Sequence, residues 1–391
     1  MKGIWKESMK NSDNGSYQNA RIKEIDFLRS FAILAVIAIH TSTNFSKIFY
    51  LNSLVIFNLV IDVFSQYGVP LFIFISGFVL SNKYYGLFSV KEFYKKRVMS
   101  ILPQYFIFSI LYISFFAVLS GKFPLFSEIF LKIITANSAI HMWFFLTIAG
   151  FYIFYPLIIA IYSYFDERNK LFAFLMLSLI FQVTWSISVL IIENGGYDPL
   201  FIYLAKRVFI PYLFYFVLGI YVSKNFHSVC VYLESMKKYK TILLLILALI
   251  TIIISFFWIV GFGYYVKGFD SFYSMSRLYF SIPVILEVLY YPLIFLLIFG
   301  VSSKIMKKDN LLASIMYSLG RHSFGIYLVH FFFITLITIQ LEHFYIYTDN
   351  WIFYPILFVT TTLLSLLSVI LISNLPLGEL AVGNTGNEKS L

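Results

Sequence analysis

Long apolar segments separated by short polar ones make up most of this chain. A helix needs about 20 mostly apolar residues to span a bilayer. Ten segments are candidates by this measure, at 26–45, 54–82, 101–120, 141–163, 171–192, 202–223, 240–260, 279–301, 316–340 and 351–374. The pattern therefore predicts an all-α fold, a polytopic membrane helical bundle with about ten transmembrane helices.

The first segment has the weakest hydrophobic signal because Arg29 and His40 interrupt it. Between them, Ser30 to Ile39 carry no charge. A separation of eleven positions is almost three helical turns, which predicts that both side chains project from one face, roughly 16 Å apart along the axis. Ionisable groups inside a membrane helix are costly and mark functional sites. This pair is therefore the first place to look for function.

The charges between the apolar segments predict the topology. Lys and Arg concentrate before the first segment and in alternate loops, within 83–97, 224–240 and 304–308, whereas the intervening loops hold few. By the positive-inside rule, both termini are cytoplasmic and the number of spans is even. We expect a multi-pass protein of the plasma (inner) membrane, and no cleavable signal peptide, because the first twenty residues are polar.

Composition agrees with lipid as the main solvent. The chain is 60% hydrophobic and 12% charged, whereas soluble domains carry roughly 25% charged residues. The net charge of +10 is spread between apolar runs, so anionic lipid headgroups and phosphate-bearing ligands are expected partners, rather than nucleic acid. The single cysteine, Cys230, excludes an intrachain disulfide and a thiol metal site, and we predict no metal.

Five segments, in order along nearly the whole chain, resemble those of one known family. They are the run from Arg21 to His40, Gly68–Phe78, the basic segment Phe93–Tyr105, His141–Leu146 and Ser323–His330. Together they resemble the acyltransferase 3 family, whose hallmark is an arginine, ten residues and a histidine. The resemblance is to its small form without an appended hydrolase-like domain. It implies a polar cytoplasmic tail (1–20), a transmembrane acyltransferase domain (21–375) and a short C-terminal tail (376–391).

Two features depart from the family pattern. Ser100 stands where the family often has a second arginine, three residues before the proline of the basic segment. The Trp-Ser-Leu-Ser-x-Glu pattern of members that modify peptidoglycan and O-antigen is absent. This absence argues against those particular acceptors.

The resemblance implies transfer of an acyl group, acetyl in the simplest case, from acyl-coenzyme A to a hydroxyl of a cell-surface or lipid-linked carbohydrate. The donor (acetyl-CoA) is then a co-substrate, and no permanently bound cofactor is expected. Membrane lipid, the carbohydrate acceptor and proteins of glycan synthesis are the expected partners. A polysaccharide exporter or flippase is the alternative. Transporters commonly show inverted repeats, and we find no internal symmetry here. Acylation of an amine, a protein or a lipid is a third option.

Three residues are candidates for catalysis. His40 suits a general base or a covalent acyl carrier, because histidine exchanges its proton near neutral pH. His141, expected at the outer mouth of the fourth span, is a candidate to bind the acceptor or to stabilise an oxyanion. Asp62 is a candidate to orient His40 in a triad-like relay. The simpler interpretation of His40 is a polar contact between helices. The simpler interpretation of Asp62 is a position close enough to the outer interface to be solvated.

The resemblance implies that Arg29 contacts the acyl-coenzyme A donor. Lys95, Lys96 and Arg97 of the next cytoplasmic loop would then meet the donor's phosphates. The simpler alternatives are an interfacial anchor for Arg29 and topology-setting charge for the basic cluster. Further candidates to line the substrate cavity share a polar side chain inside an apolar segment, and these are Ser76, Glu287 and His330. The simpler interpretation of Ser76 is that it permits close helix packing. That of His330 is a buried histidine with satisfied hydrogen bonds in the core.

Overall fold

The computed structural model describes residues 23–44, 52–196, 198–235, 241–250, 252–254, 277–305 and 310–383. Within these residues the regular structure is helical and no strand occurs. Eight helical segments of the described chain are long and apolar enough to cross a membrane. The prediction of an all-α, multi-pass membrane bundle is therefore confirmed.

The structure gives bounds for sixteen helical elements of the described chain. In chain order they are α2 (Lys23–Ser42), α3 (Ser53–Ser65), α4 (Gly68–Lys83), α5 (Val90–Ser120), α6 (Phe126–Ile134), α7 (Phe144–Asp166), α8 (Leu171–Asn194), α9 (Pro199–Arg207), η3 (Ile210–Tyr212), α10 (Leu213–Lys224), α11 (Phe226–Ser235), α13 (Arg277–Ile305), α14 (Leu311–Arg321), α15 (Ser323–His343), α16 (Phe353–Ser373) and α17 (Gly378–Val382).

Eight of the ten predicted spans coincide with the eight candidate membrane helices. The predicted span 240–260 lies partly outside the described residues. The predicted span 279–301 falls within α13, whose described apolar stretch, Leu286–Ser302, is shorter than a full crossing. The total of ten spans stays a prediction.

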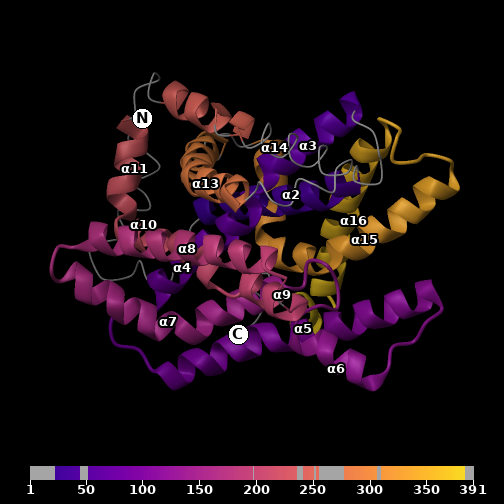
Figure 1. Ribbon diagram of the computed structural model, residues 1–391, viewed down its shortest axis with the longest axis horizontal. Helices are drawn as coiled ribbons and strands as arrows, with labels where there is room; N and C mark the ends of the chain where they lie inside the picture. Colours follow the sequence, from indigo (N-terminus) through magenta and orange to yellow (C-terminus); the bar gives the residue numbers. More distant parts are fainter. Residues whose placement is uncertain are drawn as a thin grey trace.

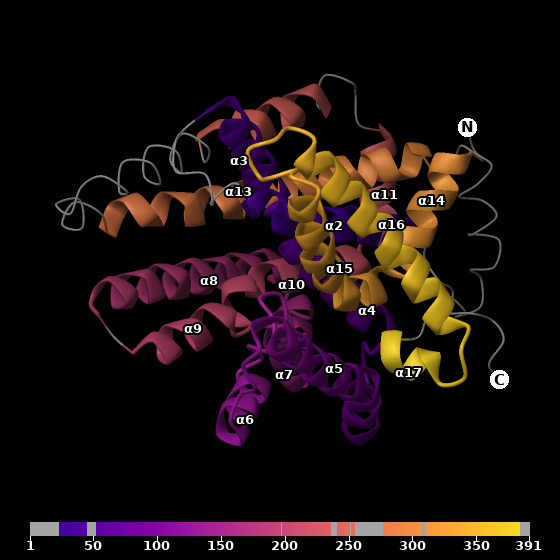
Figure 2. The same ribbon diagram turned by 90° about the vertical axis from the view of Figure 1, so that its right-hand side faces the viewer.

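Helix α2 lies in the middle of the molecule, between α13 and the pair α15 and α16 (Figure 1). It packs against α3, α4, α13, α14, α15 and α16. Most of its side chains are buried, because it is apolar on nearly every face. Helices α5, α6 and α7 gather on one side of this core in both views (Figure 2). The segment that carries Arg29 and His40 is thus enclosed by protein rather than by lipid.

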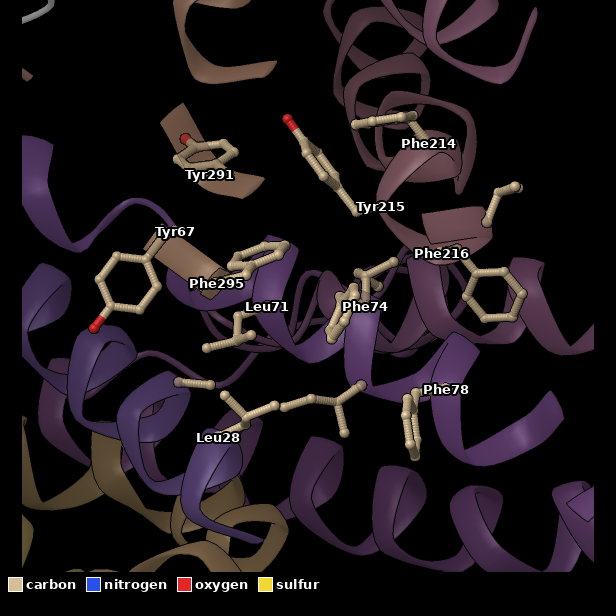
Figure 3. Close-up of a cluster of buried hydrophobic side chains, with 14 of the residues drawn as sticks. Leu28, Tyr67, Leu71, Phe74, Phe78, Phe214, Tyr215, Phe216, Tyr291 and Phe295 are labelled. Atoms are coloured by element: carbon tan, nitrogen blue, oxygen red, sulfur yellow. The ribbon is translucent and has the colours of Figure 1, made fainter. Parts of the chain in front are cut away.

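Helices α4 and α10 approach each other through two glycines. A Cβ atom at Gly77 would lie 2.2 Å from the Phe216 carbonyl oxygen, and one at Gly219 would lie 2.0 Å from the Phe74 carbonyl oxygen. Phe74 and Phe216 belong to the aromatic core beside this crossing (Figure 3). Small residues permit such close contact where lipid gives no hydrophobic drive for association.

Three predicted spans are broken rather than continuous, two of them at a proline. The predicted span 54–82 forms α3 and α4 with a turn at 66–67. Pro70, in the first turn of α4, has no N–H to donate and its ring clashes with the carbonyl four residues earlier, so one uninterrupted helix is disfavoured.

The predicted span 202–223 divides into α9, η3 and α10 for the same reason. Pro211 cannot bond the carbonyl of Arg207, and the Thr147 hydroxyl donates to this oxygen at 2.6 Å instead. A neighbouring helix thus satisfies the backbone group that the proline leaves without a partner.

The prediction that the basic cluster lies in a loop is wrong. Lys95, Lys96 and Arg97 lie in the first turns of α5, which runs from Val90 to Ser120. The side chain of Ser89 accepts a hydrogen bond from the Glu92 N–H at 3.3 Å and caps the helix. The predicted span 316–340 is likewise two helices, α14 and α15, which part at His322.

Candidate active site

Three of the six histidines meet at one point inside the bundle. The His40 ring centroid lies 5.3 Å from that of His330 and 6.4 Å from that of His141. The His141 and His330 centroids are 4.8 Å apart. The three residues come from α2, α15 and the turn that precedes α7. We call this group the histidine cluster.

Hydrogen bonds fix one ring of the histidine cluster and leave others unsatisfied. The Nδ1 atom of His330 lies 2.7 Å from the Tyr327 carbonyl oxygen, so this nitrogen carries the proton and donates. The Tyr327 hydroxyl donates to the His141 carbonyl oxygen. Both ring nitrogens of His141 and Nε2 of His330 have no hydrogen-bond partner in the described part of the chain. Since buried polar groups are normally paired, these nitrogens indicate a site that a ligand or water completes.

His40 also lines a cavity of about 280 Å³, which we call the histidine cavity. Polar and aromatic side chains make up most of its wall. They are Gln66, Gln182, Ser186 and Glu287, with Trp143, Tyr212, Tyr215 and Tyr291. Tyr215 and Tyr291 lie beside each other above Phe295 (Figure 3), with ring centroids 5.7 Å apart. Among the described residues that line it, none is a lysine or an arginine.

A second cavity, of about 430 Å³, contains three arginines, and we call it the arginine cavity. Arg29, Arg97 and Arg321 line it from α2, α5 and α14. Arg29 Nη1 lies 3.0 Å from Asp26 Oδ1. The Arg97 guanidinium carbon lies 5.6 Å from the ring centroid of Tyr152, a cation–π contact.

Aromatic side chains lie where the two cavities adjoin. The consecutive residues Trp143 and Phe144 line different cavities, the histidine cavity and the arginine cavity respectively. The Phe144 ring centroid lies 6.3 Å from that of Phe72 and 5.4 Å from that of Tyr327. Helix α2 reaches both cavities, with Arg29 in one and His40 in the other.

A family model described as an acyltransferase domain matches residues 22–370, nearly the whole chain. The chain belongs to the acyltransferase 3 family. No curated protein and no solved structure matched it. The match includes the histidine cluster and nearly all residues that line the two cavities. The protein is therefore a membrane acyltransferase, and the family predicted from the five segments is confirmed.

Two catalytic candidates of this acyltransferase have surroundings other than expected. His141 precedes α7 and lies near His40, but it is buried rather than open to a mouth, with 2% of its surface exposed. Asp62 accepts a hydrogen bond from Gln66 Nε2 at 3.2 Å, and no hydrogen bond joins it to His40 among the described residues. The neighbours of the His40 ring are instead His141, His330 and Phe331. The predicted triad-like relay does not form in this structure.

The predicted donor residues of the acyltransferase divide into two groups. Arg29 and Arg97 line the arginine cavity, whereas Lys95 and Lys96 are exposed on α5 and line neither cavity. Ser76 also lines the arginine cavity, with its hydroxyl donating to the Phe72 carbonyl at 2.8 Å.

The other two cavity candidates reach the site in different ways. Glu287 lines the histidine cavity. His330 is fully buried and contacts His40 without lining either cavity.

Sequence reasoning missed several residues that the acyltransferase brings to its cavities. Gln66 and Gln182 line the histidine cavity, and Arg321 lines the arginine cavity. An amide inside an apolar segment such as 171–192 is a usable signal, because polar groups at membrane depth need partners. Arg321 carries the same signal, because it lies inside the predicted span 316–340, as Arg29 lies inside 26–45.

Proposed function

We propose that this acyltransferase transfers an acyl group, acetyl in the simplest case, from acyl-coenzyme A in the arginine cavity to a carbohydrate hydroxyl in the histidine cavity. One observation carries the proposal: a single helix, α2, presents Arg29 to a cavity with three arginines and His40 to a cavity with none. The arginines of one wall match the phosphates of the donor, and the polar and aromatic side chains of the other match the hydroxyls and ring of the acceptor.

The arginine cavity suits the donor because coenzyme A carries several phosphate oxygens. Guanidinium groups bind phosphate through paired, charge-assisted hydrogen bonds. Arg29, Arg97 and Arg321 come from three different helices, so they surround a ligand rather than line one side. In the predicted topology, this cavity lies toward the cytoplasmic side of the membrane, where the donor is made.

His40 suits either of two routes for the chemistry. In direct transfer, it takes the proton of the acceptor hydroxyl while that oxygen attacks the thioester carbonyl; the carbon–sulfur bond then breaks and the proton passes to the thiolate. In covalent transfer, the imidazole attacks the thioester, the carbon–sulfur bond breaks, and the departing thiolate takes the imidazole proton. The sugar hydroxyl then attacks the acyl-imidazole, and the released imidazole takes the hydroxyl proton. His330, held by its bond to the Tyr327 carbonyl, packs against His40 and restricts its orientation in both routes.

The test compares glycans from cells that express either the wild type or His40→Ala. We expect His40→Ala to accumulate normally in the membrane and to lose the acyl mass increment of cell-envelope glycans. His343→Ala is the matched control, because His343 is exposed at the end of α15 and lies outside both cavities. Normal acylation with His40→Ala would refute the mechanism. Glycan that keeps its acyl group but changes its cellular location would favour export instead.

A further inference from the structure

We propose that the histidine cavity binds one uncharged sugar residue and rejects acidic sugars, with Glu287 as the residue that enforces this selection. The inference rests on the proposed function, since it names the class of acceptor that meets His40. It follows from three features of the cavity: its charge, its aromatic face and its fixed amides.

The charge of the wall disfavours an anionic ligand. Glu287 is the only carboxylate among the described lining residues, no lysine or arginine accompanies it, and His40 is the one basic side chain. An acidic sugar would lose its hydration without meeting a guanidinium or ammonium group, which is costly even before the Glu287 carboxylate repels it. An uncharged sugar offers hydroxyl groups that donate to the carboxylate.

The arginine that lies against Trp143 behind this wall packs on Tyr203. The Arg207 guanidinium carbon lies 3.8 Å from the Tyr203 ring centroid and 5.8 Å from that of Trp143. Its Nη1 donates to the Tyr203 carbonyl at 3.3 Å. Arg207 does not line the histidine cavity, so it does not offer a partner to a sugar carboxylate there.

The aromatic face suits the apolar side of a sugar ring. The rings of Trp143 and Tyr212 are nearly parallel, with an interplanar angle of 23° and centroids 6.1 Å apart. Aromatic faces carry partial negative charge and attract the slightly positive hydrogens of C–H groups. A sugar ring that packs here would direct its hydroxyls toward the polar side of the cavity.

Two amides on that polar side have fixed orientations. The Gln182 carbonyl accepts the Phe214 N–H at 2.9 Å, so its NH₂ group is the donor that faces Tyr215 and a ligand. The NH₂ group of Gln66 donates to Asp62, so its carbonyl is the acceptor. A hydroxyl both donates and accepts, so two or more hydroxyls of one sugar can together accept from Gln182 and donate to Gln66 and Glu287. The cavity volume, about 280 Å³, lies at the low end for ligand pockets and suits one sugar residue.

The experiment measures sugar binding independently of acyl transfer. Full-length protein in lipid nanodiscs is titrated with a neutral glucose trisaccharide and with the matching glucuronic acid trisaccharide, using ligand-observed NMR. We expect the wild type to bind the neutral sugar at least about tenfold more tightly, equivalent to 1.4 kcal/mol. Glu287→Gln keeps the side-chain shape and removes the charge, so we expect it to reduce this preference about tenfold.

Glu193→Gln is the matched control, because Glu193 is exposed and pairs with Lys206 at 2.6 Å outside the cavity. We expect it to leave the preference unchanged. Binding of neither sugar, or a preference that Glu287→Gln does not alter, would overturn the inference. Acyl transfer by the same samples is measured in parallel. If the wild type binds the neutral sugar selectively but transfers no acyl group to any acceptor, the proposed function fails while the inference stands.

Discussion

Arg29 is held by a carboxylate that is itself buried. Asp26 has 1% of its side chain exposed, Arg29 has 30%, and their nearest atoms are 3.0 Å apart. A guanidinium paired in this way stays at the wall of the arginine cavity, whereas an interfacial anchor extends toward water. The pair therefore favours a donor-binding role over simple anchoring, and it makes Arg29 a poor choice for mutation, since its loss would leave Asp26 without this partner.

Arg97 provides the cleaner test of the arginine cavity. We expect Arg97→Gln to raise the KM for acyl-coenzyme A about 10-fold or more with little change in kcat, because a hydrogen bond to a charged group contributes about 1.5–3 kcal/mol. The measurement is the initial rate as a function of donor concentration. Arg168→Gln is the control: Arg168 also stacks on a tyrosine, Tyr164, but is exposed and outside both cavities. An unchanged KM for Arg97→Gln would argue against a donor in this cavity.

At the scale of elements, the two spans broken at a proline contribute directly to the site. Pro70 lies just after the break between α3 and α4, and Pro211 lies in the break between α9 and α10. Both prolines line the histidine cavity. Irregular backbone at membrane depth is tolerated where it is buried in protein or lines a cavity. The prolines thus open space beside His40, at a place where continuous helices would pack side by side.

The crossing of α4 and α10 predicts a sensitive position. We expect Gly219→Ala to lower the free energy of unfolding by about 1–3 kcal/mol, because its Cβ would overlap the Phe74 carbonyl oxygen. Helix propensity alone would favour alanine by about 1 kcal/mol. Gly300→Ala is the control, since a Cβ there meets nothing within 4 Å. Thermal unfolding in detergent measures both, and equal stabilities would contradict the close packing.

At the scale of the whole molecule, α5 provides a test of orientation. Its 31 residues are longer than the roughly 20 that a bilayer requires. Exposed lysines lie near its two ends, Lys95 and Lys122. In a Cys230→Ser background, we expect Lys122→Cys to react with a membrane-impermeant thiol reagent in intact cells, and Lys95→Cys to react only after permeabilisation, because the positive-inside rule predicts a cytoplasmic basic end. The reverse pattern would invert the proposed topology.

The sequence by itself determined the class of fold and the first functional pair. Hydropathy is a local property, so apolar length predicted a membrane bundle and located eight candidate membrane helices. A charge within an apolar run is equally local, and Arg29 and His40 were found for that reason. Family motifs are also local, and they identified the acyltransferase.

Only the tertiary structure decided how the site is assembled. Counting residues along one span predicted an open mouth at His141, whereas distant helices bury it and the Tyr327 hydroxyl donates to its carbonyl. Asp62 has the right chemistry for a relay, but its partner is Gln66. The meeting of His40 with His330 joins residues 290 positions apart. Such contacts depend on how distant helices pack, and packing is set by shape at each crossing, which a pattern along one segment does not contain.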